Sequence, residues 1–173
     1  MPITPAQFQV LYPQIVAWMQ ETLRSHADSA RSVQSAGFPT LSQYYSAGLL
    51  QRAKYIPVAN PPKPPLTKLG LQQFHAFEQQ EVKGITYLDT YFVRLGCEDQ
   101  ESLHFHELIH VVQWSVLGPE QFVAAYADGL ERFGYWHCPL EVMAYKAESE
   151  FVRGRIFDAE KRVRKELAHI YGL

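Results

Sequence analysis

The chain has 173 residues, of which 47% are hydrophobic and 20% charged, and its formal net charge at pH 7 is −2. This length and composition suit one compact domain with a substantial core. The mixed charge argues against a protein that tracks nucleic-acid phosphates, and no apolar run approaches the roughly 20 residues of a membrane helix. The first residues have neither a basic region nor an apolar stretch, and the chain has only two cysteines. We therefore expect a cytoplasmic protein without a disulfide framework.

The first part of the chain favours helix. Apolar residues recur at helical spacing from Phe8 to Leu23, although Pro13 between them predicts an interruption or a new helix start. Beyond a turn at Gly37, the pattern predicts a short helix over 41–47. A weak alternation over residues 50–58 then indicates a strand.

Five prolines between residues 57 and 65 mark the middle of the chain. Proline lacks the amide hydrogen and fixes φ, so this segment predicts a stiff, extended crossing. We therefore divide the chain into an N-terminal helical lobe over 1–65 and a core over 66–173. With so few residues before the crossing, the two parts also suit one continuous domain.

The second part alternates between helix and strand signals. Apolar residues over 71–77 share one helical face, and residues 85–93 are rich in the β-branched and aromatic types that favour a strand. A helix follows from 98 to Gly118-Pro119, with carboxylates in its first turn, and another over 120–131. A third begins at Pro139 and continues with breaks to His169. The fold class predicted is α+β, dominated by helices, with a small antiparallel or mixed sheet.

Residues 106–110 read His-Glu-Leu-Ile-His and fall within the strongest predicted helix. On a helix, His106 and His110 project from the same face and can bind one zinc ion. Glu107, beside the first histidine, can take a proton from a water whose pKa zinc lowers to about 7. The spacing therefore predicts a zinc site with Glu107 as the general base. Two ordinary histidines on an amphipathic helix are the alternative.

A zinc site of this kind needs a third protein ligand. The metzincin pattern requires a glycine and a third histidine where this chain has Gln113 and Val116, so that class is excluded. Glu141, in the first turn of the helix that starts at Pro139, is a rigidly placed carboxylate and our predicted third ligand. Glu148, two turns further along, is a weaker candidate.

The motif His106-Glu-Leu-Ile-His-Val-Val-Gln-Trp114, followed by Pro139-Leu-Glu-Val-Met-Ala-Tyr145, resembles the gluzincin class of zinc metallopeptidases. It is most similar to the small single-domain minigluzincins and related uncharacterised bacterial proteins. The resemblance covers roughly residues 84–150. It implies a zincin-like core with an active-site helix and a glutamate helix, in which His106, His110 and Glu141 bind zinc and Glu107 is the general base.

The resemblance also implies a substrate position. The strand at 85–93 would match the edge strand that holds an extended peptide by main-chain pairing. One position departs from the pattern, because many gluzincins have an aspartate four residues after the third ligand and this chain has Tyr145. Tyr145 would share a face with Glu141, where it is either a donor to a developing oxyanion or a packed core tyrosine.

Other polar residues near the motif have weaker signals. His137 and Cys138 precede Pro139 and could reach a metal, although a turn that enters a helix explains them as well. His104 points away from His106 on a helix, which predicts a supporting or surface position. Asp89 and Asp128 are candidates to orient a zinc-binding histidine, but nothing in their spacing selects them.

The sequence thus predicts a zinc metallopeptidase that acts on a peptide or protein substrate, with no nucleic acid or membrane partner. One alternative is a latent or non-catalytic zinc-binding domain, in which the lobe over 1–65 fills the cleft and the chain acts as an interaction module. A second alternative is a structural helical protein without a metal.

Overall fold

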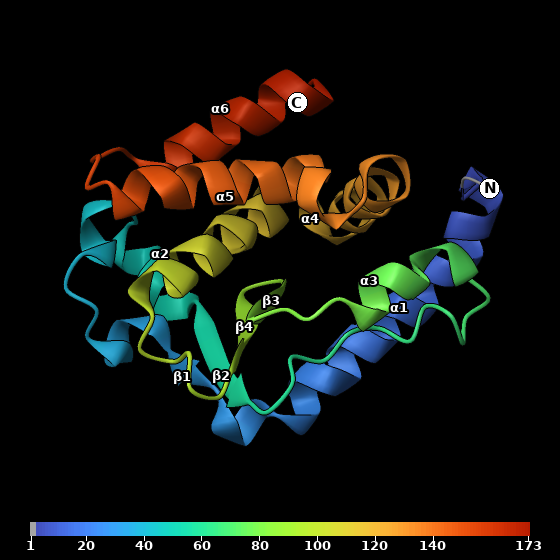
Figure 1. Cartoon of the computed structure of the whole chain (residues 1–173), viewed down its shortest axis with the longest axis horizontal. Helices are drawn as coiled ribbons and strands as arrows, with labels where there is room; N and C mark the ends of the chain where they lie inside the picture. The colour runs from blue at the N-terminus through green and yellow to red at the C-terminus, as the bar shows by residue number, and fades with distance from the viewer. Residues whose placement is uncertain (1–2) are drawn as a thin grey trace.

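The computed structural model describes residues 3–173, in which helices predominate over a small mixed sheet (Figure 1). This arrangement confirms the predicted helix-dominated α+β class. The helices are α1 (Pro5–Ser25), α2 (Ala47–Arg52), α3 (His75–Gln79), α4 (Glu101–Phe133), α5 (Pro139–Val152) and α6 (Ala159–Tyr171). The strands are β1 (Arg31–Ser32), β2 (Lys54–Val58), β3 (Gly84–Tyr87) and β4 (Thr90–Arg94). Short 3-10 segments cover Ala27–Ser29, Val33–Ala36, Leu41–Gln43, Gln72–Phe74 and Tyr135–His137.

Helix α1 starts at a capping box and runs straight through a proline. The Thr4 hydroxyl accepts from the amide of Gln7, and the Gln7 side chain accepts from the amide of Thr4. The interruption predicted at Pro13 is wrong, because α1 continues across it. Pro13 and Gln9 are both exposed, so the Gln9 carbonyl that loses its helical partner can bind water instead.

The helix predicted over 41–47 starts later than expected. Residues Leu41–Gln43 form only a 3-10 turn, and α2 begins after Ser46, whose hydroxyl accepts from the amide of Leu49 at 3.3 Å. Serine is a favoured N-cap, so it sets a new helix start at this point. The strand predicted over 50–58 is consequently shorter and consists of β2 alone.

The sheet has the order β1-β2-β4-β3, with β2 and β4 parallel and the other two pairs antiparallel. The single strand predicted over 85–93 is wrong, because β3 and β4 form a hairpin in which Tyr87 pairs with Thr90. Leu88 in the turn has a φ of 61°, a conformation that β-propensity does not reveal. Because β3 is the last strand in the order of the sheet, it is an edge strand, and it is only four residues long.

The sheet joins both of the predicted parts of the chain. β1 and β2 come from residues 1–65, whereas β3 and β4 come from residues 66–173. One cluster of buried apolar side chains likewise extends from Ile15 in α1 to Leu167 in α6. The N-terminal segment thus supplies half of the strands and a part of the same core.

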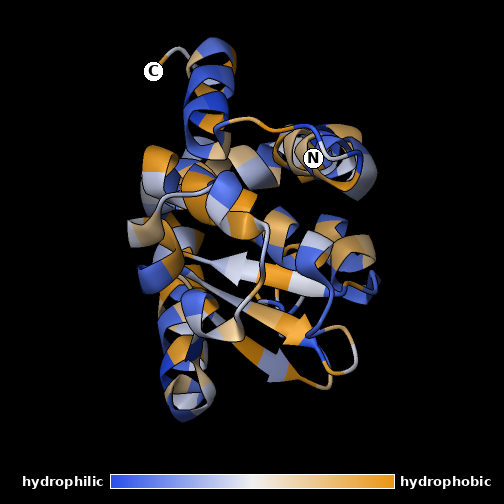
Figure 2. Cartoon of the chain, turned by 90° about the vertical axis from the view of Figure 1, so that its left-hand side faces the viewer, coloured by the Kyte–Doolittle hydropathy of each residue, from blue (hydrophilic) through white to orange (hydrophobic). Residues whose placement is uncertain are grey.

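Helix α4 has two halves that meet at Gly118, whose φ of 74° and ψ of 164° are not helical. The predicted helix end at Gly118-Pro119 and the second helix after it are thus confirmed. The first half of α4 contacts β3 and α5, and α6 packs on α4 as well. Helix α6 is mainly hydrophilic (Figure 2) and buries one stripe that contains Val163 and Leu167. Among residues 3–173, no helix combines the length and the apolar character that a membrane crossing requires.

Candidate metal centre

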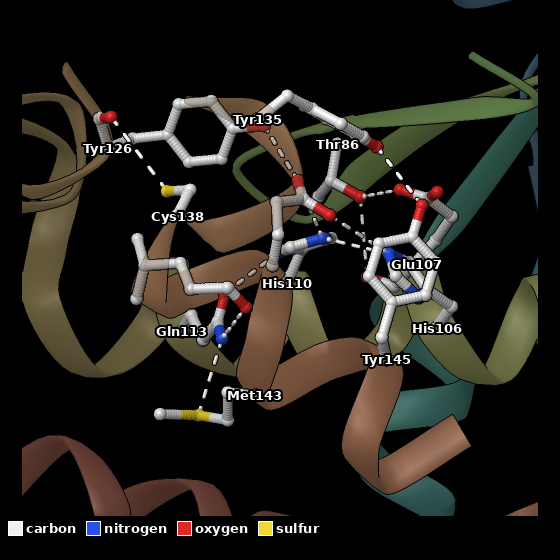
Figure 3. A network of polar contacts seen from close by, with 12 residues as sticks. Thr86, His106, Glu107, His110, Gln113, Tyr126, Tyr135, Cys138, Met143 and Tyr145 are labelled. Carbon is white, nitrogen blue, oxygen red and sulfur yellow. Dashed lines mark hydrogen bonds and ion pairs between the residues drawn. The ribbon is translucent and has the colours of Figure 1, made fainter. Parts of the chain in front are cut away.

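Four side chains with acid–base or metal-binding chemistry lie together where α4 meets α5 and β3, and three of them, His106, Glu107 and His110, are labelled in Figure 3. His106, Glu107 and His110 come from the first half of α4, and Glu141 comes from the first turn of α5. Each is only 3–4% exposed. The four-residue spacing puts the two imidazoles on one helical face, and the packing of α5 on α4 brings Glu141 to them.

Three donor groups converge at distances that suit a metal ion. The Nε2 atoms of His106 and His110 lie 3.2 Å apart. One oxygen of Glu141 lies 3.4 Å from Nε2 of His106, and the other lies 3.4 Å from Nε2 of His110. In a tetrahedral site with ligand distances of 2.0–2.1 Å, neighbouring ligand atoms are about 3.3 Å apart. His106, His110 and Glu141 could therefore hold one metal ion.

Both imidazoles are oriented by an acceptor at the nitrogen that faces away from the centre. Glu148 Oε2 accepts from Nδ1 of His106 at 3.1 Å, and Gln113 Oε1 accepts from Nδ1 of His110 at 2.8 Å. The Gln113 amide has one orientation, because its Nε2 donates to the Leu140 carbonyl at 3.0 Å. Each neutral ring thus carries its proton on Nδ1 and directs the Nε2 lone pair into the shared space.

Glu141 is an ionised carboxylate that protein groups satisfy only in part. The Tyr126 hydroxyl donates to Oε1 at 2.6 Å, whereas the buried Oε2 has no hydrogen-bond partner among residues 3–173. Burial opposes ionisation, but His110 and His106 hold the pKa of Glu141 well below its usual value. An ionised oxygen buried without a donor is costly, and a cation between it and the two imidazoles would remove that cost.

The carboxylates in turn raise the pKa values of the histidines. Burial alone would lower the pKa of His106, but Glu141 and Glu148 raise it to about 10. Burial also lowers the pKa of His110, and Glu141 more than compensates, so its pKa is raised as well. The centre therefore requires positive charge, which either protons or a metal cation in their place can supply.

Glu107 lies beside the three donor groups and is held by β3. The Thr86 hydroxyl donates to Glu107 Oε2 at 2.6 Å. Gly84 leaves the space that the carboxylate occupies, because a Cβ at position 84 would lie 2.7 Å from Cδ of Glu107. Burial raises the pKa of Glu107, so its carboxylate is a stronger base than that of an exposed glutamate.

Aromatic side chains line one side of the centre. The ring of Tyr145 lies 4.5 Å from that of His106, and its hydroxyl is 3.3 Å from the hydroxyl of Tyr135. Trp136, which is 59% exposed, lies against the outer side of Tyr145. Tyr145 is 36% exposed and is thus at the rim rather than in the core. Donation from Tyr145 to an oxyanion stays a prediction.

Three other candidate ligands, Glu148, His137 and Cys138, take other positions. Glu148 was the weaker choice for the third ligand, and it lies at the outer nitrogen of His106 instead. His137 is exposed, whereas Cys138 is buried with its Sγ 3.9 Å from the Tyr126 carbonyl. Neither belongs to the group of donors that converges among residues 3–173.

The residues predicted to support the histidines also lie elsewhere. His104 is fully buried rather than near the surface, with Nδ1 2.7 Å from the Tyr91 hydroxyl and Nε2 2.8 Å from the Glu98 carbonyl. Asp89 accepts from the neighbouring Thr90, and Asp128 pairs with Arg132. Glu148 and Gln113 orient the rings in their place.

Four residues of the site had not been assigned a role from the sequence: Gly84, Thr86, Gln113 and Tyr126. Gln113 follows His110 by three residues, so helical spacing could have revealed it. Thr86 and Tyr126 reach the site because β3 and the second half of α4 pack beside it. Local sequence patterns do not predict such contacts between distant residues.

A scan against protein-family models, a search of curated proteins and a search of solved structures each found no match to this chain. The interpretation of the site therefore depends on its own geometry and on the residues that form it.

Proposed function

We propose that this protein is a zinc-dependent hydrolase that cleaves peptide bonds, with a zincin-like core and the ligand set of a gluzincin. The observation that carries the proposal is the convergence of two Nε2 atoms and the two oxygens of one partly unsatisfied carboxylate, at distances of 3.2–3.4 Å. Two imidazoles and one carboxylate leave a fourth position open, which is typical of catalytic rather than structural zinc sites.

The donor set fits zinc. Imidazole nitrogen suits zinc well, whereas calcium and magnesium favour sites built from oxygen ligands. A bound zinc ion supplies Lewis acidity, which lowers the pKa of a coordinated water and polarises a carbonyl group.

Glu107 supports catalysis as the general base. Its carboxylate accepts a hydrogen bond from the Thr86 hydroxyl and packs closely against Gly84, which has no side chain to displace it. A base held in one place beside the reacting groups needs little rearrangement before proton transfer. The same carboxyl group, once protonated, can pass the proton to the leaving amine.

The edge strand β3 supports the predicted position of a peptide substrate. Among residues 3–173, β4 is the only strand that pairs with β3, so no strand occupies the other side of β3. The Thr86 carbonyl accepts from Nε1 of Trp114 at 3.1 Å, so a peptide would have to pair with the other backbone groups of this short strand.

The substitution Glu107→Gln tests the proposal. It removes the base but keeps a side chain of the same size, and we expect zinc content to be unchanged and peptide cleavage to fall about 100-fold or more. Glu120→Gln, at an exposed position in the second half of the same helix, is the matched control and should cleave at the wild-type rate. Full activity in zinc-loaded Glu107→Gln would exclude the assigned base.

One observation favours a latent form of the same site as a second candidate. Phe8, Leu11 and Ile15 of α1 line the pocket that contains the metal-binding residues, and those residues are 3–4% exposed. In a latent protein, α1 would limit substrate entry. The double variant Leu11→Ala/Ile15→Ala should then cleave peptides faster than the zinc-loaded wild type, and an equal or lower rate would argue against occlusion by α1.

A further inference from the structure

An apolar pocket extends from the metal-binding residues along the inner face of α1. Its cavity volume is about 110 Å³, and α1, α3, β3 and both halves of α4 contribute to its walls. On α1 the lining residues are Phe8, Leu11, Ile15 and Met19, together with Ile3 before the helix. These four helix positions form one apolar stripe at helical spacing.

The residues that line the pocket on α1 extend over several turns of the helix. From Phe8 to Met19 the lining follows α1 for 11 residues, which at the helical rise corresponds to about 16 Å. Val123 and Ala127 on the second half of α4 contribute to the opposite wall. A single large side chain would fill only part of this length.

The lining offers almost nothing to a polar ligand away from the metal-binding residues. Among the described residues that line it, the only ionisable groups besides tyrosines are His106, Glu107, His110 and Glu141. A peptide backbone inside it would lose water from its amide and carbonyl groups without gaining partners. An alkyl chain has no such groups, and its transfer from water into the pocket is favourable.

We propose that this pocket binds a linear apolar chain of a substrate whose polar end lies at the metal-binding residues. The inference rests on the hydrolase function proposed above and names its substrate class: an N-acyl amide with a linear acyl chain of about six carbons, which a cavity of about 110 Å³ can hold. Hydrolysis adds one water across the C–N bond and gives a fatty carboxylic acid and a free amine, which itself can belong to a peptide.

Linear alkyl hydroxamates with two to twelve carbons are suitable probes, because the head group binds zinc and the chain length can be varied alone. Calorimetric titration of the full chain, with zinc and after its removal, separates the contribution of the head group to binding from that of the alkyl chain. The affinity should rise about fourfold for each added methylene up to about six carbons in both forms. Zinc should strengthen binding by the same factor for every chain length.

A matched pair of variants locates the chain within the pocket. Ala127→Phe places a ring in the lining and should weaken the six-carbon hydroxamate at least tenfold while leaving the two-carbon hydroxamate unchanged. Ala124→Phe introduces the same side chain on the same helix outside the lining and should bind like the wild type. Leu11→Trp should reproduce the effect of Ala127→Phe from the opposite wall.

An affinity independent of chain length in the wild type would overturn the proposed pocket ligand, whatever the variants do. In that case a two-carbon hydroxamate that still binds only the zinc form would leave the metal centre intact. A chain-length dependence in a protein that binds no zinc would instead support the pocket and contradict the hydrolase.

Discussion

Gly84 and Glu107 are packed so closely that the glycine of the strand determines where the carboxylate of the helix can lie. A Cβ at position 84 would come within 2.7 Å of Cδ and 3.0 Å of Cγ of Glu107. Because Glu107 is buried and accepts a hydrogen bond from Thr86, two residues further along β3, it has little room to move aside. The position of the proposed base thus depends on the absence of a side chain two residues before Thr86.

Gly84→Ala should therefore displace Glu107 without removing a metal ligand. We expect zinc content to stay the same and peptide cleavage to fall about 100-fold, as is typical when a reacting group is misplaced by about 1 Å. Gly48→Ala in α2 is the matched control, because a Cβ there meets no atom within 4 Å and the glycine has no positive φ. Zinc analysis and a cleavage assay on both variants would check this prediction, and equal rates would refute it.

Glu148 should determine how strongly the centre binds its metal. Its carboxylate accepts from Nδ1 of His106 at 3.1 Å and so makes Nε2 the better ligand. Glu148→Ala should weaken zinc binding about 10- to 100-fold. Glu150→Ala is a control on the same helix, since Glu150 bonds to Arg162 of α6 instead. Competition with a chelator of known affinity measures the zinc affinity of both variants. A wild-type zinc affinity in Glu148→Ala would show that Glu148 does not support metal binding.

The contact between α5 and α6 should make stability depend on pH. Arg162 donates two hydrogen bonds to Glu150, at 2.8 and 2.9 Å, and thereby lowers the pKa of Glu150 to about 2 from an ordinary value near 4.5. A group whose pKa is lower in the folded state stabilises the fold above its unfolded pKa. That contribution is lost as the pH falls from about 4.5 to about 2.

Glu150→Gln should accordingly lower the melting temperature at pH 7, and the difference from the wild type should shrink as the pH approaches 2. The same difference should also decrease in 1 M salt, because the pair is partly exposed. Glu81→Gln, at a more exposed and longer contact with Arg94, is the control and should show no such trend. A difference that does not vary with pH would mean that Glu150 acts through packing rather than charge.

Helical periodicity was sufficient to predict the part of the centre that one helix carries. His106 and His110 lie one turn apart in the segment with the strongest helix prediction, and Pro139 marks a helix start that presents Glu141 rigidly. Gly118 likewise breaks α4 where its sequence predicted. These features are local, so the sequence within one or two turns is enough to identify them.

The parts that were wrong or missed depend on contacts between distant residues. Residues 85–93 have the composition of one strand, and only the pairing of Tyr87 with Thr90 shows that they form a hairpin. Tyr126 and Thr86 reach the site because the second half of α4 and β3 pack beside it. His104 has a polar side chain, yet it is buried because Tyr91 and Glu98 satisfy both of its nitrogens.

The metal content of the untagged protein tests the central claim most directly. Elemental analysis after purification without added metal should find about one zinc per chain, and Glu141→Ala and His110→Ala should each reduce that content at least tenfold. Glu131→Ala, at a carboxylate that contacts the amide of Ile3 instead of the centre, should retain the full amount. Less than about 0.1 zinc per wild-type chain, even after incubation with zinc and removal of the excess, would contradict the account.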